Sequence, residues 1–136
     1  LEAQVIPNGV DAARLAPAEI RVGHPPHILF AGRFMRQKNV VGLVRILGRL
    51  RALAWEATLV GDGPQRAEGR SEIARQGLEG RVSLPGWVSP DEVLRAMRQA
   101  DILLMPSLSE GMPVVGVQAL AMGLALVVSD IGGFSG

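Results

Sequence analysis

The chain alternates between short apolar runs and longer segments in which apolar residues recur at a helical spacing. Short apolar runs are typical of strands that are buried on both faces of a sheet. Apolar residues three or four positions apart line one face of a helix. The pattern predicts strands at residues 27–31, 55–60, 81–84, 102–105 and 126–128, with a helix between each strand and the next.

Two of the predicted helices follow from this spacing alone. The first starts at Asn39 and leaves Arg45 and Arg49 on its solvent side. The second covers residues 65–78 but has a thin apolar face with Gly69 inside it, so we expect a weaker helix. The apolar face of the first helix consists of Val40, Leu43, Val44, Leu47 and Leu50.

The other two predicted helices have start and stop signals. Ser89, Pro90 and Glu92 combine an N-cap, a first-turn proline and a capping-box carboxylate. Pro113 is expected as the first residue of the last helix, and Gly123 ends it. This last helix and the strands on either side of it are almost entirely apolar, so we expect both strands to be buried on both sides.

Strands that alternate with helices predict an α/β domain with an open, mostly parallel sheet and helices on both faces. We assign it to residues 27–136. Residues 1–26 are expected to be an interdomain linker, because residues 5–11 form a short apolar segment with a proline and an Asn-Gly turn. The chain starts without a methionine and stops where another helix should follow, so we expect a C-terminally truncated fragment of a longer protein.

The amino-acid composition limits the kinds of functional site that this chain can form. With 14 basic and 13 acidic residues, the net charge of +1 gives no support by itself for nucleic-acid or membrane binding. The absence of cysteine removes disulfides and thiolate catalysis and fits a reducing compartment. Only two histidines are present, and no apolar run approaches the roughly 18 residues of a membrane-spanning helix. We expect neither a metal nor a cofactor.

Ligands of open parallel sheets bind beyond the carboxyl ends of the strands. The loop before the last helix is the clearest candidate, because unpaired amides and the positive end of the helix dipole attract anions there. Gly111 lets a ligand approach the backbone, and Glu110 and Gln118 bracket it, with Gln118 about 7 Å along the helix axis. The loops at the carboxyl ends of the strands form one rim of the sheet. We expect this rim to contain Arg33, Lys38 and residues 61–64, 85–88, 110–113 and 130–133.

Arg33 and Lys38 can together offset the charge of a diphosphate without a metal ion. The chain has no GxGxxG or GxxxxGK[ST] motif, which counts against a standard dinucleotide site or a P-loop. Each candidate also has an ordinary structural explanation, and the spacing leaves both readings open. The ordinary explanations are solvated cations at Arg33 and Lys38, a surface carboxylate at Glu110, an internally hydrogen-bonded Gln118, a packed Trp87 and a simple turn at residues 61–64.

Five ordered motifs resemble the C-terminal, donor-binding domain of the retaining GT-B glycosyltransferases of family 4, a group that contains mannosyl-, glucosyl- and N-acetylglucosaminyltransferases. The resemblance covers nearly the whole chain and implies a Rossmann-like domain that is one half of a GT-B fold. The motifs are PNGVD at residues 7–11, GRFxxxK at 32–38, LVGDGP at 59–64, PGWV at 85–88 and ADILLMPSLSEGMPVVGVQALAMG at 100–123.

The resemblance implies roles for individual residues. Arg33 and Lys38, joined by backbone amides at the start of the last helix, would hold the donor diphosphate. Glu110, the first carboxylate of the family's Glu-x7-Glu pair, would contact the transferred sugar, so these three side chains are the implied catalytic set. The implied donor site comprises Gly32, Arg33, Lys38, Gly61, Asp62, Gly63, Trp87, Val88, Glu110, Gly111, Met112, Pro113, Val114 and Gln118.

Position 118 departs from the family, which has a second glutamate there to accept hydrogen bonds from the ribose. An amide offers a single acceptor atom, so we expect weaker donor binding.

Three readings stay open: a retaining transferase, a non-catalytic sugar-nucleotide module, and a GT-B-type epimerase. The resemblance further implies a UDP-, GDP- or ADP-sugar donor and a separate N-terminal domain for a glycan, lipid or small-molecule acceptor. It implies a cytoplasmic protein that does not bind nucleic acid, and it leaves peripheral membrane association open.

Overall fold

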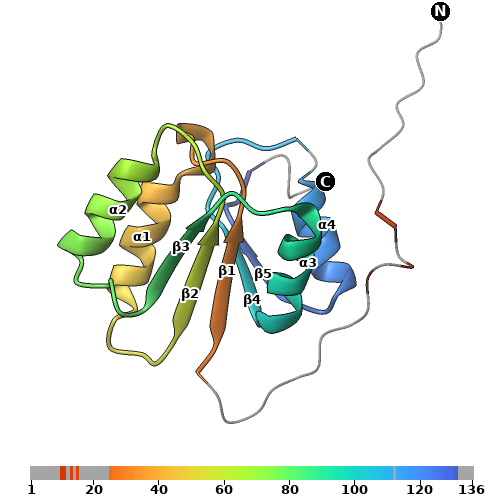
Figure 1. The fold of residues 1–136 in the computed structure, drawn as a ribbon, viewed down its shortest axis with the longest axis horizontal. Helices are drawn as coiled ribbons and strands as arrows, with labels where there is room; N and C mark the ends of the chain where they lie inside the picture. The colour runs from red at the N-terminus through yellow and green to blue at the C-terminus, as the bar shows by residue number, and fades with distance from the viewer. Residues whose placement is uncertain (1–9, 12, 14, 16–24, 112, 132–136) are drawn as a thin grey trace, which may run out of the picture.

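The computed structural model describes residues 10, 11, 13, 15, 25–111 and 113–131. Within them, five parallel strands form one sheet in the order β3-β2-β1-β4-β5, with helices on both faces (Figure 1). This confirms the predicted fold. Residues 1–9, 12, 14 and 16–24 of the expected linker lie outside the described part, so the linker stays a prediction. The strands are β1 (His27–Ala31), β2 (Glu56–Val60), β3 (Val82–Gly86), β4 (Ile102–Met105) and β5 (Ala125–Val128). The helices are η2 (Arg36–Lys38, 3-10), α1 (Val40–Arg49), α2 (Arg66–Arg75), α3 (Pro90–Gln99) and α4 (Val114–Ala121).

The central strand β1 builds two cores, because its successive side chains point to opposite faces of the sheet. Ile28 and Phe30 pack with apolar side chains of α1 and α2. Leu29 and Ala31 pack with those of α3 and α4. Both faces of β1 are therefore covered, which explains its unbroken apolar sequence and fixes the position of the loop that follows it.

Three strand predictions differ from the structure. β2 starts one residue later than predicted, at Glu56, and the other two differences concern the edges of the sheet. β3 continues through Pro85 to Gly86, past the predicted end at residue 84. Proline is tolerated at edge strands and bulges, and β3 is an edge strand whose pairing with β2 is irregular. β5 was expected to be buried on both sides, but Val127 is 50% exposed because β5 forms the other edge.

The helix signals are largely confirmed. The Ser89 hydroxyl accepts from the Glu92 amide and the Glu92 carboxylate accepts from the Ser89 amide, so α3 has the predicted capping box. Pro113 is the N-cap of α4, not its first residue, because its ψ of 108° is extended. Leu50 caps the C-terminus of α1 and is 37% exposed, so it does not belong to the buried face. Among the described helices, none is long and apolar enough to cross a membrane.

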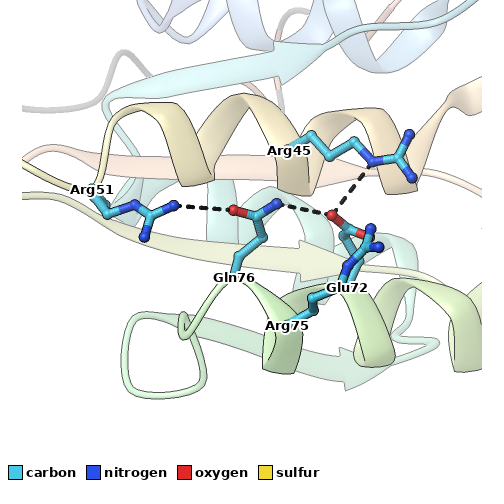
Figure 2. A network of polar contacts seen from close by, with 5 residues as sticks. All are labelled: Arg45, Arg51, Glu72, Arg75 and Gln76. Atoms are coloured by element: carbon cyan, nitrogen blue, oxygen red, sulfur yellow. Dashed lines mark hydrogen bonds and ion pairs between the residues drawn. The ribbon is translucent and has the colours of Figure 1, made fainter.

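A buried carboxylate joins α1 to α2, whose own apolar face is thin. Glu72 of α2 is 4% exposed and accepts hydrogen bonds from Arg45 of α1, from Arg75 and from Gln76 (Figure 2). Gln76 accepts in turn from Arg51 at the end of α1. The hydrogen bond from Gln76, followed by the hydrogen bond and charge of Arg75 and the charge of Arg45, lowers the pKa of Glu72 against the opposing effect of burial. Polar contacts thus attach α2 where apolar ones are few.

Candidate functional site

The sheet order places β2 on one side of β1 and β4 on the other, and this switch point is where open parallel sheets bind ligands. The loops after β1 and β4 are joined there by hydrogen bonds. The Gln37 carbonyl accepts from the Leu108 amide at 2.8 Å, and the Gln37 side chain donates to the Ser109 carbonyl at 3.0 Å. The Asn39 side chain donates to the Pro106 carbonyl at 3.0 Å. The two loops therefore form one continuous wall.

An ion pair lies between these loops. Lys38 Nζ donates to Glu110 Oε1 at 2.5 Å, and Ser107 Oγ donates to the same oxygen at 2.7 Å. The side chains of Lys38 and Glu110 are 20% and 6% exposed. Two residues that are 72 positions apart in the sequence are thus brought together, in a site from which much of the water is excluded. The predicted meeting of Lys38 with the mouth of α4 is present in the structure.

A hollow of about 590 Å³ lies beyond the carboxyl ends of the first three strands. Arg33 stands at the end of β1, and Trp87 follows β3. Most of the lining comes from strand ends and the loops after them, with one valine each from α3 and α4. The residues that line it are Ala31, Gly32, Arg33, Val60, Gly61, Asp62, Gly63, Trp87, Val88, Val93 and Val115.

The loops after β1 and β2 approach so closely that position 61 requires glycine. Gly61 has a φ of +137°, and a Cβ there would lie 1.8 Å from the Gly32 carbonyl oxygen. Main-chain pairing also continues past the strand ends, from the Gly32 amide to the Val60 carbonyl and from the Phe34 amide to the Asp62 carbonyl. Part of the segment at residues 61–63 is therefore explained by packing of one loop against another.

The hollow brings together the predicted residues of the first three loops except Lys38. Arg33 is exposed, and no hydrogen bond or ion pair joins its guanidinium to another described residue. Trp87 is 74% exposed, so its interpretation as a packed side chain is wrong. Asp62 is also exposed, and its carboxylate accepts from the Gly63 amide at 2.8 Å. Met112 and the glycines at 132 and 133 lie outside the described residues.

The predicted residues around α4 do not line this hollow. Glu110 lies in the adjoining wall with Lys38, and Gly111 and Val114 are exposed at the start of the helix. Gln118 is half-buried, and its side chain makes no hydrogen bond to another described residue, so an internally satisfied amide is not found there. It lies one turn beyond Val115, on the same side of α4 as that lining residue.

Five contributors to the site were not predicted: the lining residues Ala31, Val60, Val93 and Val115, and the buried Ser107. Val93 and Val115 line the hollow from the first turns of α3 and α4, and apolar residues at such positions look like ordinary core residues in a sequence. Ser107 is 1% exposed and hydrogen-bonds Glu110. Its spacing of three residues before a loop carboxylate was the one available signal.

Comparison with known proteins places this arrangement in a family. Residues 25–136 match the family model described as glycosyl transferases group 1. The 2-deoxystreptamine glucosyltransferase of Streptomyces kanamyceticus is 34% identical over 142 residues, which cover 95% of this chain and 37% of that protein. The phosphatidyl-myo-inositol mannosyltransferase of Mycolicibacterium smegmatis is 34% identical over 142 residues, which cover 98% of this chain and 36% of that protein.

The fold is similar to solved glycosyltransferase structures. The apo form of the lipopolysaccharide outer core galactosyltransferase WaaB matches with a TM-score of 0.81 at 28% identity, over 94% of this chain and 37% of that one. The chain spans about a third of the length of the curated relatives it matches. A five-stranded parallel sheet of GT-B type and a family match over residues 25–136 together show that this chain belongs to the glycosyl transferases group 1 family.

Proposed function

We propose that this chain is the donor-binding domain of a retaining glycosyltransferase of family 4, and that residues 27–136 bind a UDP-, GDP- or ADP-sugar. The observation that carries the proposal is the junction at the switch point, where the Lys38–Glu110 pair adjoins a hollow of about 590 Å³ edged by Arg33. Relatives at 34% identity that are named glucosyltransferase and mannosyltransferase support sugar transfer. Retention is proposed on the family resemblance.

The diphosphate of the donor is assigned to Arg33, Lys38 and the start of α4. The Arg33 guanidinium is free of described partners and borders the hollow. Lys38 has three N–H donors, so its contact with Glu110 leaves others for a phosphate oxygen. The first amides of α4 have no partner within the helix, and the positive end of its dipole favours an anion beside them.

The two ends of the donor are assigned to opposite sides of the diphosphate. Trp87 presents an exposed aromatic ring beside Val88, and we assign the nucleobase and ribose to this side of the hollow, together with Gly61, Asp62 and Gly63. Glu110 is assigned to the transferred sugar, because a carboxylate accepts hydrogen bonds from hydroxyl groups. Gln118 is assigned to the ribose, one helical turn beyond Val115.

Transfer breaks the bond between the anomeric carbon and the diphosphate, and negative charge develops on the leaving diphosphate. Arg33, Lys38 and the α4 dipole stabilise that charge, which is preorganised electrostatic catalysis without a nucleophile from this chain. The acceptor, whether glycan, lipid or small molecule, is assigned to a separate N-terminal domain. The chain is therefore proposed to bind donor without turning it over.

A cytoplasmic location, with peripheral membrane association for a lipid acceptor, belongs to the same proposal.

Isothermal titration of the chain with UDP, GDP and ADP, with and without an attached sugar, tests the proposal. We expect one base to bind. In an Arg33→Ala/Lys38→Ala double variant, affinity should fall at least about 100-fold, because each charge-assisted hydrogen bond contributes about 1.5–3 kcal/mol. What binding remains should depend less on salt.

The matched control removes the same charge elsewhere. Arg49 and Arg98 are exposed on α1 and α3 and do not line the hollow, so Arg49→Ala/Arg98→Ala should bind nucleotide as the wild type does. Equal losses in the two double variants would assign the effect to overall charge and not to the site. Absence of binding to all three nucleotides by a folded chain would refute the proposed function.

Gln118 favours a second candidate, a non-catalytic sugar-nucleotide module, because an amide is a poorer partner for a ribose diol than a carboxylate. The two candidates differ in the full-length protein. A transferase hydrolyses its donor slowly even without acceptor, whereas a binding module leaves the nucleotide sugar intact. Incubation with the bound nucleotide sugar, followed by separation of free nucleoside diphosphate, distinguishes them.

A further inference from the structure

Both hydrogen-bond donors to the Glu110 carboxylate reach the same oxygen. Lys38 Nζ lies 2.5 Å from Oε1 and Ser107 Oγ lies 2.7 Å from it. Oε2 accepts no hydrogen bond from another described residue. The Glu110 side chain is 6% exposed and Ser107 is 1% exposed, so this arrangement is held by its surroundings. One oxygen is fixed and the other is available to a ligand.

We propose that Ser107 is a positioning residue that sets the rotation of the Glu110 carboxylate, so that Oε2 is presented to one hydroxyl group of the transferred sugar. The inference rests on the proposed function, in which Glu110 contacts that sugar. Ser107 suits this role because it follows the end of β4 closely and is buried, so its hydroxyl is anchored to the sheet and not to the mobile ligand.

Lys38 has a different place in the same arrangement. Its ammonium group binds Glu110 and is also assigned to the diphosphate, so it connects the sugar end of the donor with the phosphate end. Arg33 makes no contact with Glu110 and serves the diphosphate alone. The three side chains therefore affect different parts of the donor: Ser107 the sugar, Arg33 the diphosphate, and Lys38 both.

The experiment compares two affinities for each variant. Wild type, Ser107→Ala and Ser109→Ala are titrated with UDP, GDP and ADP and with UDP-glucose, GDP-mannose and ADP-glucose. The measured quantity is the dissociation constant of the nucleoside diphosphate divided by that of its sugar conjugate, for the pair that binds best. Ser109 is the matched control, because it lies in the same loop, is exposed, and its hydroxyl bonds no other described residue.

In Ser107→Ala we expect this ratio to fall about 3- to 10-fold, because the Glu110 carboxylate can then rotate and part of its hydrogen bond to the sugar is lost, while the affinity for the nucleoside diphosphate changes less than about twofold. Ser109→Ala should leave both values unchanged. Lys38→Ala should lower the ratio and the nucleotide affinity together, whereas Arg33→Ala should weaken the nucleotide and its sugar conjugate equally and leave the ratio unchanged. A merely structural defect would weaken the nucleotide and its sugar conjugate by the same factor, and that result would overturn the inference.

The wild type separates this inference from the proposed function. If it binds none of the six ligands, the proposed function is wrong and the inference falls with it. If it binds a nucleotide but gains nothing from the sugar, nucleotide binding stands and the role of Ser107 is overturned. If Ser107→Ala keeps the wild-type ratio, only the assignment of Ser107 fails. Should Ser107→Ala prove unfolded by thermal melting, Ser107→Cys, which keeps a side chain of similar size but a much weaker hydrogen-bond donor, replaces it and should lower the ratio in the same way.

Discussion

Gln118 is half-buried in α4 with no described partner for its side-chain amide, although it lies one turn beyond a residue of the hollow. A carboxylate at this position would place a negative charge in the same half-buried surroundings. Burial without donors disfavours that charge, whereas a ribose diol would supply two donors. Binding and stability should therefore respond in opposite directions to the same substitution.

We predict that Gln118→Glu raises the affinity for nucleotide about 5- to 10-fold, because a hydrogen bond to a charged acceptor is stronger by about 1 kcal/mol or more. The melting temperature without ligand should fall. Titration and thermal unfolding measure the two effects. Ala121→Glu, which adds the same charge at an exposed position of α4, is the control for affinity and should leave it unchanged. Unchanged affinity in Gln118→Glu would show that this residue does not touch the ribose.

Glu72 is the second residue whose environment allows a specific test. Its pKa is lowered in the folded chain by Gln76 first and then by Arg75 and Arg45. A carboxyl group with a lowered folded pKa stabilises the fold fully above its unfolded pKa and loses that effect as pH falls through the folded value. Glu72→Gln should therefore cost about 1–2 kcal/mol at pH 7, since the arginines can turn to solvent but the buried hydrogen bonds weaken.

The difference in unfolding free energy between wild type and Glu72→Gln should shrink as pH is lowered from about 6 to about 3. Urea unfolding at a series of pH values measures it. Glu79 is exposed in the loop after α2, so Glu79→Gln serves as control and should show no such dependence. A constant difference at all pH values would mean that the charge of Glu72 contributes nothing.

At the scale of elements, the loops after β1 and β2 approach so closely that Gly61 has no room for a side chain. We predict that Gly61→Ala costs about 3 kcal/mol or more, because the new Cβ meets the Gly32 carbonyl and the φ of +137° strains an alanine. Gly80→Ala is the matched control: nothing lies within 4 Å of its Cβ, and a small gain of about 0.4–1 kcal/mol is expected. Chemical denaturation of both variants measures the costs, and equal stabilities would contradict the argument.

The boundaries predicted from the sequence were most accurate for strands that are buried on both faces. β1 and β4 match their predicted bounds at both ends, because strands buried on both faces are unbroken apolar runs. β3 and β5 differ, because edge strands can include a proline, such as Pro85, or an exposed residue, such as Ala125. The capping box of α3 was predictable because its partners are three residues apart, whereas α2 depends on Arg45, a residue of another helix.

At the scale of the whole molecule, the net charge of +1 conceals an uneven distribution. Residues 27–81 carry ten basic and five acidic side chains, and residues 82–131 carry two basic and five acidic ones. The first group contains Arg33 and Lys38, so an anionic ligand is attracted to the half of the sheet that holds both cations. Overall composition could not reveal this, because it depends on the order of the charges along the chain.

The general position of the site was predictable from topology, because parallel strands end on one rim and a switch point gathers their loops. The meeting of Lys38 with Glu110 was anticipated in this way. The exposure of Trp87 and the contribution of Val115 were not, because both depend on how α3 and α4 lie over the strand ends. Ser107 escaped notice for a related reason, since its partner is decided by a loop conformation that no short-range pattern encodes.

Main chain makes up much of the lining of the hollow, through Gly32, Gly61 and Gly63. Those positions have no side chain to exchange, and at Gly61 nothing larger fits. Mutagenesis aimed at changing the proposed sugar-nucleotide specificity therefore has few side chains to alter. A focused library at Trp87, Val93 and Val115 would reshape the cavity while sparing the backbone that supports it.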